Sequence, residues 1–356
     1  MRNEPEPDDR FHRLEKARVL LARARDVFAG KTFQPHRLFR GGHAQTIAAY
    51  AWPRIFRFVP EKDQERLFEV GPGVRVLAHC RWQAERDKHP TIVVWHGIEG
   101  STASSYMQAM AEKGFHAGFN VIRVNFRNCG GTEHLTETIY HGGLSADLGA
   151  VVNELIEHDH ISNLVLVGFS LGGNLVLKLA GEYGDKPPRE IRGVCAVSPS
   201  VDLSASADMI VERSNWIYHR DFVRRLKQRI RTNHELYPER YDVSGLDEVR
   251  TLREFDDRYT SVAHGFADAA DYYYRASSLR VVDRIRIPTL IIHAADDPFI
   301  PVTPLREPAV ADNPYILLLA PEQGGHVAFI SADRNGDDDR FWAENRVVEF
   351  CTLASR

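Results

Sequence analysis

The feature that most constrains the fold is an apolar run that ends in a serine between two glycines and passes directly into a helical pattern. Residues 163–167 (NLVLV) form a nearly continuous Leu/Val run, as in a strand buried on both faces of a parallel sheet. Residues 168–172 (GFSLG) follow, and 171–183 favour a helix. Such a strand, sharp turn and helix hold the serine in a strained backbone with its hydroxyl above the sheet. Ser170 is therefore a candidate nucleophile; the alternative is a glycine-rich helix start.

Candidate strands alternate with candidate helices from residue 91 onward, which predicts an α/β fold. Alternation of this kind implies a mostly parallel sheet with helices on both faces. A hairpin at 67–70 and 74–80, joined by Gly71-Pro72-Gly73, adds an antiparallel edge. The strands are expected at 91–95, 120–126, 163–167, 192–198, 289–294 and 315–319, and the helices at 105–113, 146–158, 171–183 and 341–351.

The interval from about 203 to 280 breaks this alternation. It is rich in charged and aromatic residues and contains no clear buried strand. Because such a long excursion exceeds an ordinary connection, we expect a helical insertion that caps the site. The predicted organisation is a lead segment at 1–60, an α/β core at 61–203 and 281–356, and a cap at 204–280.

Residues 11–29 of the lead segment have the pattern of an amphipathic helix. Leu14, Ala17, Leu21 and Phe28 recur at helical spacing, and basic side chains crowd the rest of the surface. The favoured interpretation is a helix packed on the domain with a solvated basic face. The alternative is a helix at a membrane surface or lipid interface. The following GGHAQT segment predicts a turn into another short helix, in which His43 is expected to be a hydrogen-bonded structural residue.

Composition excludes several classes of function. The chain has 356 residues, 43% of them hydrophobic, and a net charge of −4, so it can bury a large core and offers no field that would attract nucleic acid. Its four cysteines lack metal-ligand spacing, which favours free thiols in a reducing compartment. No apolar run approaches the ~20 residues that span a bilayer, and the start does not resemble a secretory signal. We expect a cytoplasmic protein with no cofactor and no metal.

A serine nucleophile needs a base, and the base needs a carboxylate that fixes its tautomer. In a sheet of this kind the acid and then the histidine follow the serine, on loops after later strands. Asp297 follows the strand at 289–294, and the prolines around it turn the chain away from that strand. Asp296 is the neighbouring alternative, as a helper or loop cap. Asp202 is a more distant candidate, better explained as a helix cap.

His326 is the candidate base. It follows the last strand, at 315–319, and Gly324-Gly325 lets the backbone bend and aim the imidazole back over the sheet. The 127 residues from Ser170 to Asp297 leave room for the cap, and the 29 from Asp297 to His326 leave room for one strand. His141 and His264 are expected to be structural.

A tetrahedral oxyanion also needs donors that are already in place. The Leu171 amide, at the start of the helix after the nucleophile, is one expected donor, assisted by the helix dipole. The other is expected from the loop HGIEGS at 96–101, and we assign it to the Ile98 amide. The alternative for this loop is a simple glycine turn before a helix. The glycine-rich loops at 127–132 and 140–143 do not match phosphate-binding motifs and are expected to border the pocket.

With these residues assembled, the chain resembles the YheT-like branch of the α/β-hydrolase superfamily, which includes eukaryotic alpha/beta-hydrolase-domain lipases and esterases. Phe169 stands where tyrosine is expected, Ile98 where leucine is common and Asn128 where glycine is common. The resemblance implies the triad Ser170, Asp297 and His326. It rests on GGHAQTI at 41–47, HGIEGS at 96–101, FRNCGG at 126–131, GFSLGGN at 168–174, FDD at 255–257, HGF at 264–266, DYYYRASS at 271–278, HAADDPFIP at 293–301 and GGHVAF at 324–329.

The function expected from these residues is a serine carboxylic-ester hydrolase that works through an acyl-enzyme on short- to medium-chain or lipid-like esters. Two alternatives remain at this point. The same triad could transfer an acyl group to an alcohol, or the chain could be a non-catalytic ligand-binding protein on a hydrolase scaffold.

Overall fold

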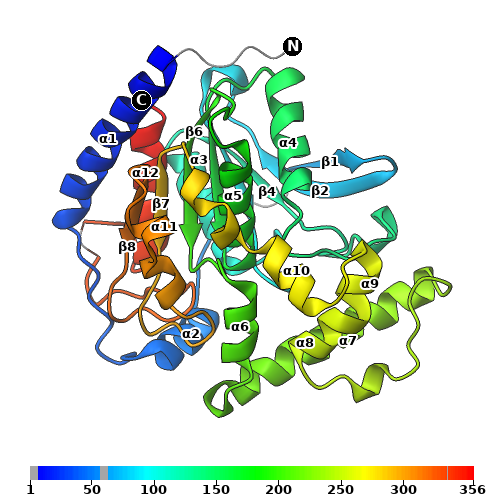
Figure 1. The fold of residues 1–356 in the computed structure, drawn as a ribbon. Coiled ribbons are helices and arrows are strands. Elements are labelled where there is room, and N and C mark those ends of the chain that lie inside the picture. Colours follow the sequence, from blue (N-terminus) through cyan, green and yellow to red (C-terminus); the bar gives the residue numbers. More distant parts are fainter. Residues whose placement is uncertain (1–6, 57–62, 335) are drawn as a thin grey trace.

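A single mixed sheet organises the protein (Figure 1). The computed structural model describes residues 7–56, 63–334 and 336–356. The sheet has the order β1-β2-β4-β3-β5-β6-β7-β8, in which β1, β2 and β4 are joined by antiparallel pairings and all remaining neighbours are parallel. The strands are β1 (Gln64–Gly71), β2 (Val74–Arg81), β3 (Thr91–Trp95), β4 (Asn120–Val124), β5 (Leu164–Phe169), β6 (Ile191–Val197), β7 (Thr289–Ile292) and β8 (Ile316–Leu319).

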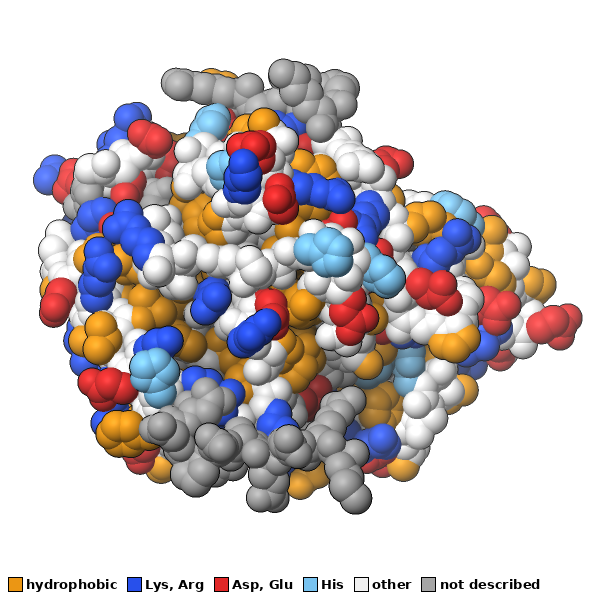
Figure 2. All heavy atoms as spheres, turned by 90° about the horizontal axis from the view of Figure 1, so that it is seen from above, with side chains coloured by type: hydrophobic (Ala, Val, Ile, Leu, Met, Phe, Trp, Pro, Cys, Tyr) orange, Lys and Arg blue, Asp and Glu red, His pale blue; other side chains and the backbone are white. Residues whose placement is uncertain are grey.

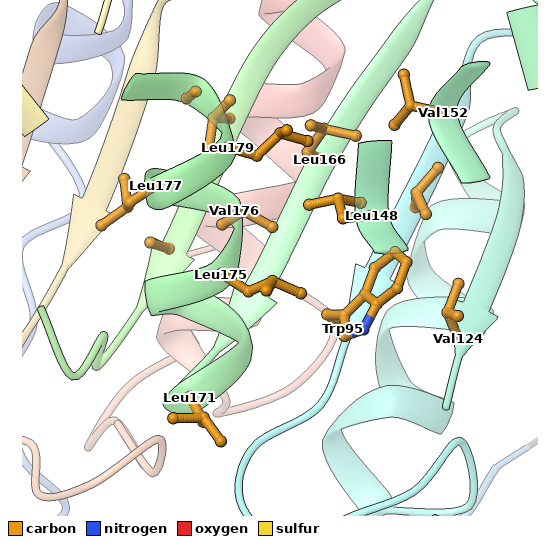
Figure 3. Packing of buried hydrophobic residues seen from close by; sticks show 14 of the residues in the cluster. Trp95, Val124, Leu148, Val152, Leu166, Leu171, Leu175, Val176, Leu177 and Leu179 are labelled. Atoms are coloured by element: carbon orange, nitrogen blue, oxygen red, sulfur yellow. The ribbon is translucent and has the colours of Figure 1, made fainter. Parts of the chain in front are cut away.

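The predicted α/β fold class is confirmed, because helices cover both faces of this sheet. Strands β3, β4 and β5 are buried along their whole length, as continuous apolar runs require. On one face α4 (Ser145–Glu157) and α5 (Leu171–Tyr183) pack against side chains such as Trp95 and Leu166. Figure 3 shows Leu175 of α5 pointing toward Trp95 of β3. Alternate strand residues, such as Val94 and Val167, face α1 (Pro7–Ala29), α3 (Ser105–His116) and α12 (Trp342–Ala354).

The N-terminal helix α1 packs on the core as predicted. Its residues Ala17, Leu21, Ala24 and Phe28 are buried, and the helix contacts α12 and β8. Contact of its exposed face with a membrane stays a prediction. Within the described residues, no helix is both long and apolar enough to cross a bilayer. The face of the molecule drawn in Figure 2 mixes Lys and Arg with Asp and Glu side chains, in keeping with the small net charge.

The predicted helical cap follows β6. It has its own buried cluster, which includes Leu226, Ile230, Tyr259 and, from the core, Ile139. Its exact boundaries with the core remain a prediction. In Figure 1 these helices lie together beside one end of the sheet. They are α6 (Leu203–Ile210), α7 (Trp216–Leu236), α8 (Leu252–Phe255), the π-helical turn Asp256–Thr260, α9 (Ser261–His264) and α10 (Ala269–Ala276); α2 (Gly42–Ala51) and α11 (Pro308–Ala311) lie outside the cap sequence.

The four cysteines are free and buried, as the sequence predicted. Burial raises the pKa of Cys80 and of Cys129 to about 12, so neither thiol ionises near neutral pH.

Candidate active site

Ser170 occupies a strained turn between β5 and α5. Its φ of 53° and ψ of −117° lie outside the regions that a non-glycine residue favours, and such a conformation costs on the order of 1–3 kcal/mol. The flanking glycines make the turn possible. A Cβ on Gly168 would lie 2.0 Å from the Gly172 carbonyl oxygen, and one on Gly172 would lie 2.5 Å from the His96 carbonyl oxygen. Strand and helix therefore touch where the serine emerges, as predicted from the motif.

The structure pairs His326 with Asp297. Asp297 follows β7, His326 follows β8, and His326 Nδ1 lies 2.8 Å from Asp297 Oδ2. The other carboxylate oxygen accepts the amides of Phe299 and Ile300 at 2.9 and 3.1 Å. Burial by itself raises the pKa of Asp297, but the charge and hydrogen bond of His326, with help from His293, hold it below its usual value. Asp297 is thus a buried carboxylate that fixes the imidazole.

Asp296 has a different role in the loop. Its Oδ1 accepts the Gly325 amide at 2.9 Å, next to the histidine in sequence. Its Oδ2 is buried and has no hydrogen-bond partner among the residues that the structure describes. Burial raises the pKa of Asp296, the opposite direction from Asp297. Asp297, and not Asp296, therefore contacts the imidazole, and the role of Asp297 as the acid stays a prediction.

Ser170, His326, Ile98 and Leu171 line one pocket. Among the described residues, neither the Ile98 amide nor the Leu171 amide donates to a protein acceptor. Leu171 is the first residue of α5, where the helix dipole favours a negative charge. Both expected donors therefore border the same space as Ser170 and His326, and their N–H groups have no partner in the described part of the chain.

Core side chains hold the loop that carries Ile98. His96 is fully buried, its Nε2 accepts the Phe126 amide at 3.1 Å, and its Nδ1 lies 2.7 Å from the Gly97 carbonyl oxygen. These backbone partners assign the proton to Nδ1, and burial lowers the pKa of His96 to about 4, so the ring is neutral. The Gly97 amide donates to the Tyr106 hydroxyl at 2.9 Å. His96 is thus a structural part of this loop, and no role for it was predicted.

The GGHAQT segment contacts both the loop of Asp296 and the loop of His326, a role that was not predicted. A Cβ on Gly42 would lie 1.8 Å from the Asp296 carbonyl oxygen. The Thr46 hydroxyl accepts the His326 amide at 2.9 Å. His43 itself is exposed and stacks on Tyr218 of the cap, with ring centroids 5.8 Å apart, and no hydrogen bond to it is found within the described residues. The pair of adjacent glycines was the sequence signal for this close approach.

The pocket is mainly apolar and is shared by core and cap. It holds about 870 Å³, including its opening to solvent. Its apolar wall combines Ile98, Ile139, Leu171, Phe299 and Ile300 with cap residues Leu203, Ala207, Ile210, Phe222, Leu226, Leu252 and Phe255. Such a lining suits a hydrocarbon chain better than a charged group.

The remaining candidates, Asp202, His141 and His264, contact their own loops and helices. Asp202 caps α6, where its Oδ1 accepts the Ala205 amide at 3.1 Å. His264 lies 2.8 Å from the Ile139 carbonyl oxygen through Nε2, and its ring contacts that of His141. Burial lowers the pKa of both histidines, that of His264 to about 4. Within the described chain, no group of three or more His, Cys, Asp or Glu side chains could hold a metal ion.

This sheet order, nucleophile turn and helical cap define an α/β hydrolase. A family model described as "alpha/beta hydrolase fold" matches residues 90–333, and the chain belongs to that family. Within it, the chain is similar to a protein of Escherichia coli (strain K12) named "Putative esterase YheT". The two are 31% identical over 339 residues, which cover 94% of this chain and 97% of the bacterial protein. The predicted relation to the YheT-like branch is thereby confirmed.

A second curated relative and one solved structure also match the chain, and the solved structure supports the fold alone. The chain is 32% identical over 273 residues to a monoacylglycerol lipase of Saccharomyces cerevisiae, which covers 72% of this chain and 58% of the yeast protein. Among solved structures, the Pyrococcus furiosus esterase Pf2001 matches with a TM-score of 0.56 at 17% identity, covering 85% of this chain and 97% of that one. The chain is a member of a hydrolase family with esterases and lipases.

Proposed function

We propose that this protein is a serine carboxylic-ester hydrolase with Ser170, His326 and Asp297 as its catalytic triad. The observation that carries the proposal is the 2.8 Å contact between the buried carboxylate of Asp297 and the imidazole of His326. This imidazole lines the same apolar pocket as Ser170, whose backbone is strained. The relatives named as esterases and lipases favour an ester substrate.

The proposed reaction begins with attack of Ser170 Oγ on the ester carbonyl carbon. His326 Nε2 takes the hydroxyl proton, while Asp297 accepts the hydrogen bond from Nδ1–H and stabilises the imidazolium. The amides of Ile98 and Leu171 donate to the oxyanion. When the tetrahedral intermediate collapses, the C–O bond to the alcohol breaks and His326 returns the proton to the leaving oxygen. Water then attacks the acyl-enzyme with His326 as base, and the carboxylic acid and free Ser170 are released.

The lining of the pocket supports an uncharged, hydrocarbon-rich acyl or alcohol group. Full burial of one Leu-sized group is worth ~1.5–3 kcal/mol, so each methylene that reaches the cap wall should improve kcat/KM. We therefore expect medium-chain esters to be better substrates than acetate, up to the length that the pocket accepts.

A panel of p-nitrophenyl esters of graded acyl length tests the proposal, with Ser170→Ala as the control. We expect hydrolysis by the wild type, a rise in kcat/KM with chain length, and no turnover by the variant. Failure of a fluorophosphonate to label the folded protein would instead favour the non-catalytic alternative. Dominant transesterification at low concentrations of an added alcohol would favour acyl transfer.

A further inference from the structure

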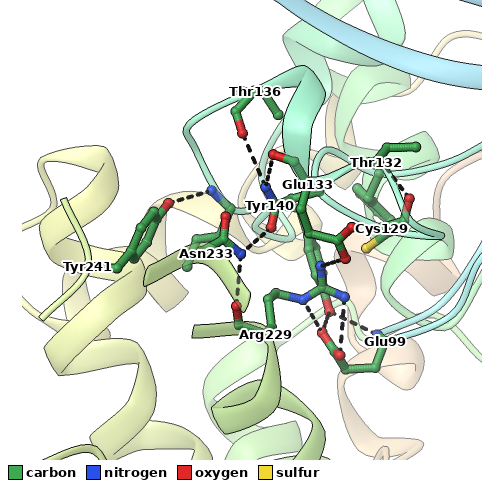
Figure 4. Close-up of polar contacts among 12 residues, drawn as sticks. Glu99, Cys129, Thr132, Glu133, Thr136, Tyr140, Arg229, Asn233 and Tyr241 are labelled. Atoms are coloured by element: carbon green, nitrogen blue, oxygen red, sulfur yellow. Dashed lines mark hydrogen bonds and ion pairs between the residues drawn. The ribbon is translucent and has the colours of Figure 1, made fainter. Parts of the chain in front are cut away.

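A side chain of the cap holds the residue that follows the proposed oxyanion donor. Arg229 of α7 donates from Nε and Nη2 to the two carboxylate oxygens of Glu99, at 2.8 and 3.2 Å (Figure 4). The Arg229 and Glu99 side chains are only 8% and 7% exposed. A two-point contact between a guanidinium and a carboxylate fixes orientation as well as distance.

Tyr140 holds the same residue through its backbone. The Glu99 amide donates to the Tyr140 hydroxyl at 2.8 Å, and this hydroxyl donates to Glu99 Oε1 at 2.9 Å. The guanidinium of Arg229 lies over the Tyr140 ring, 5.2 Å from its centroid. Glu99 has a φ of 52°, a left-handed conformation that a glutamate does not favour, so it needs such support.

These contacts bracket the Ile98 amide. The Gly97 amide on one side is bound by Tyr106, and the Glu99 amide on the other side is bound by Tyr140. The Ile98 amide between them has no protein acceptor among the described residues. Tyr106 and Tyr140 belong to the core, whereas Arg229 belongs to the cap. Among these contacts, the Arg229–Glu99 ion pair joins the cap directly to the loop that carries Ile98.

We propose that Arg229 is a positioning residue, which binds Glu99 and thereby fixes the Ile98 amide when the cap is seated over the pocket. The inference rests on the proposed function. In this proposal the cap does more than line the substrate pocket, because a cap that moves away would release Glu99 and weaken the oxyanion site. Catalysis and cap closure are coupled through this pair.

The remaining nitrogen of Arg229 offers an alternative that the same experiment decides. Nη1 lies 4.0 Å from Glu133 Oε1, and among the described residues it has no hydrogen-bond partner. Arg229 also borders the pocket. If Arg229 bound an anionic part of the substrate instead, its removal would raise KM. If it were only a structural ion pair, its removal would lower stability with kcat unchanged.

The test measures kcat and KM for the best p-nitrophenyl ester in Arg229→Met, Arg229→Lys and the double variant Glu99→Gln/Arg229→Met. The double variant leaves no unpaired buried charge, so it stays folded if the single variant does not. Arg231→Met is the matched control, because Arg231 pairs with Asp247 on the exposed side of the same helix, 44% and 88% exposed. We expect kcat to fall about 10- to 100-fold in both Met variants, as for loss of part of an oxyanion site. KM should stay within about two-fold, and the control should match the wild type. Arg229→Lys should recover only part of kcat, because an ammonium keeps the charge but cannot make the two-point contact with Glu99.

Hydrogen–deuterium exchange of residues 97–101 gives a reading that does not require turnover. Arg229→Met should speed exchange of the Glu99 amide while peptides of the central sheet keep their wild-type rates. An unchanged kcat, a rise in KM alone, or unchanged exchange in this loop would overturn the inference. A wild type that hydrolyses no ester while Arg229→Met still loosens the loop would instead refute the proposed function and leave the positioning contact intact.

Discussion

Replacing Asp297 by Asn tests the proposed base most selectively. The side chain keeps its shape, but one accepting carboxylate oxygen becomes an NH₂ group, which donates. The carboxylate accepts three hydrogen bonds, from Phe299, Ile300 and His326. The amide oxygen of Asn can keep the two backbone donors, which places its NH₂ group opposite His326 Nδ1. The ring must then accept there and carry its proton on Nε2. In that tautomer, His326 cannot take the proton of Ser170.

The expected loss follows from the chemistry of such triads. A wrong tautomer of the base costs about 10⁴-fold in kcat, and at ~1.4 kcal/mol for each factor of ten this corresponds to ~5.5 kcal/mol of transition-state stabilisation. The assay is hydrolysis of one p-nitrophenyl ester under saturating substrate. Unfolding in urea checks that the variant keeps the wild-type fold.

Asp296→Asn is the matched control. Asp296 accepts the Gly325 amide and does not contact the imidazole, so we expect its kcat to stay within about ten-fold of the wild type. The reasoning would be refuted if Asp297→Asn kept more than a tenth of wild-type activity, or if Asp296→Asn were the more damaged variant.

Three further predictions use other parts of the site. Ile98→Ala keeps the backbone donor and should leave ester hydrolysis within about two-fold; a loss above ten-fold would argue against a role through the amide. Gly172→Ala places a Cβ 2.5 Å from the His96 carbonyl oxygen. We expect it to lower the free energy of unfolding in urea by ~1–3 kcal/mol and to lower activity, and wild-type stability would contradict the close contact. Burial raises the pKa of Asp256 to about 6 despite hydrogen bonds from Thr260 and Tyr273. The protonated Asp256 carboxyl therefore stabilises the folded wild type near pH 4, and this stabilisation is lost as the pH rises through 6. From pH 4 to 7, the free energy of unfolding of the wild type should fall by up to ~3 kcal/mol relative to that of Asp256→Asn. A pH-independent difference in urea unfolding would contradict this assignment.

The central strands could be predicted from the sequence because β3, β4, β5 and β7 are buried along their whole length. The Thr91–Trp95 strand and the helix Leu171–Tyr183 have the predicted bounds, whereas the strand expected at 120–126 ends at Val124. Asn125 and Phe126, the two residues after Val124, lie outside the strand but are still buried. Hydrophobicity alone does not separate such residues from a strand.

The proposed triad could be predicted because topology brings the ends of β5, β7 and β8 to one edge, and each carries one functional side chain. The Arg229–Glu99 pair could not. Its two residues are 130 positions apart, and α7 carries many other arginines, several of them exposed. Which of these arginines contacts Glu99 depends on how the cap packs on the core, and the sequence does not show this. The support of Asp296 and His326 by α2 depends on packing in the same way.

The central claim is that Ser170 forms an acyl-enzyme. Rapid acid quench during turnover of a slowly deacylating ester, followed by mass spectrometry of the digested protein, measures this intermediate directly. We predict that the peptide containing Ser170 gains the mass of the acyl group minus one hydrogen, and that Ser170→Ala gains none. Release of alcohol in a wild-type burst with no acyl group on that peptide, or with the acyl group on another residue, would contradict the account.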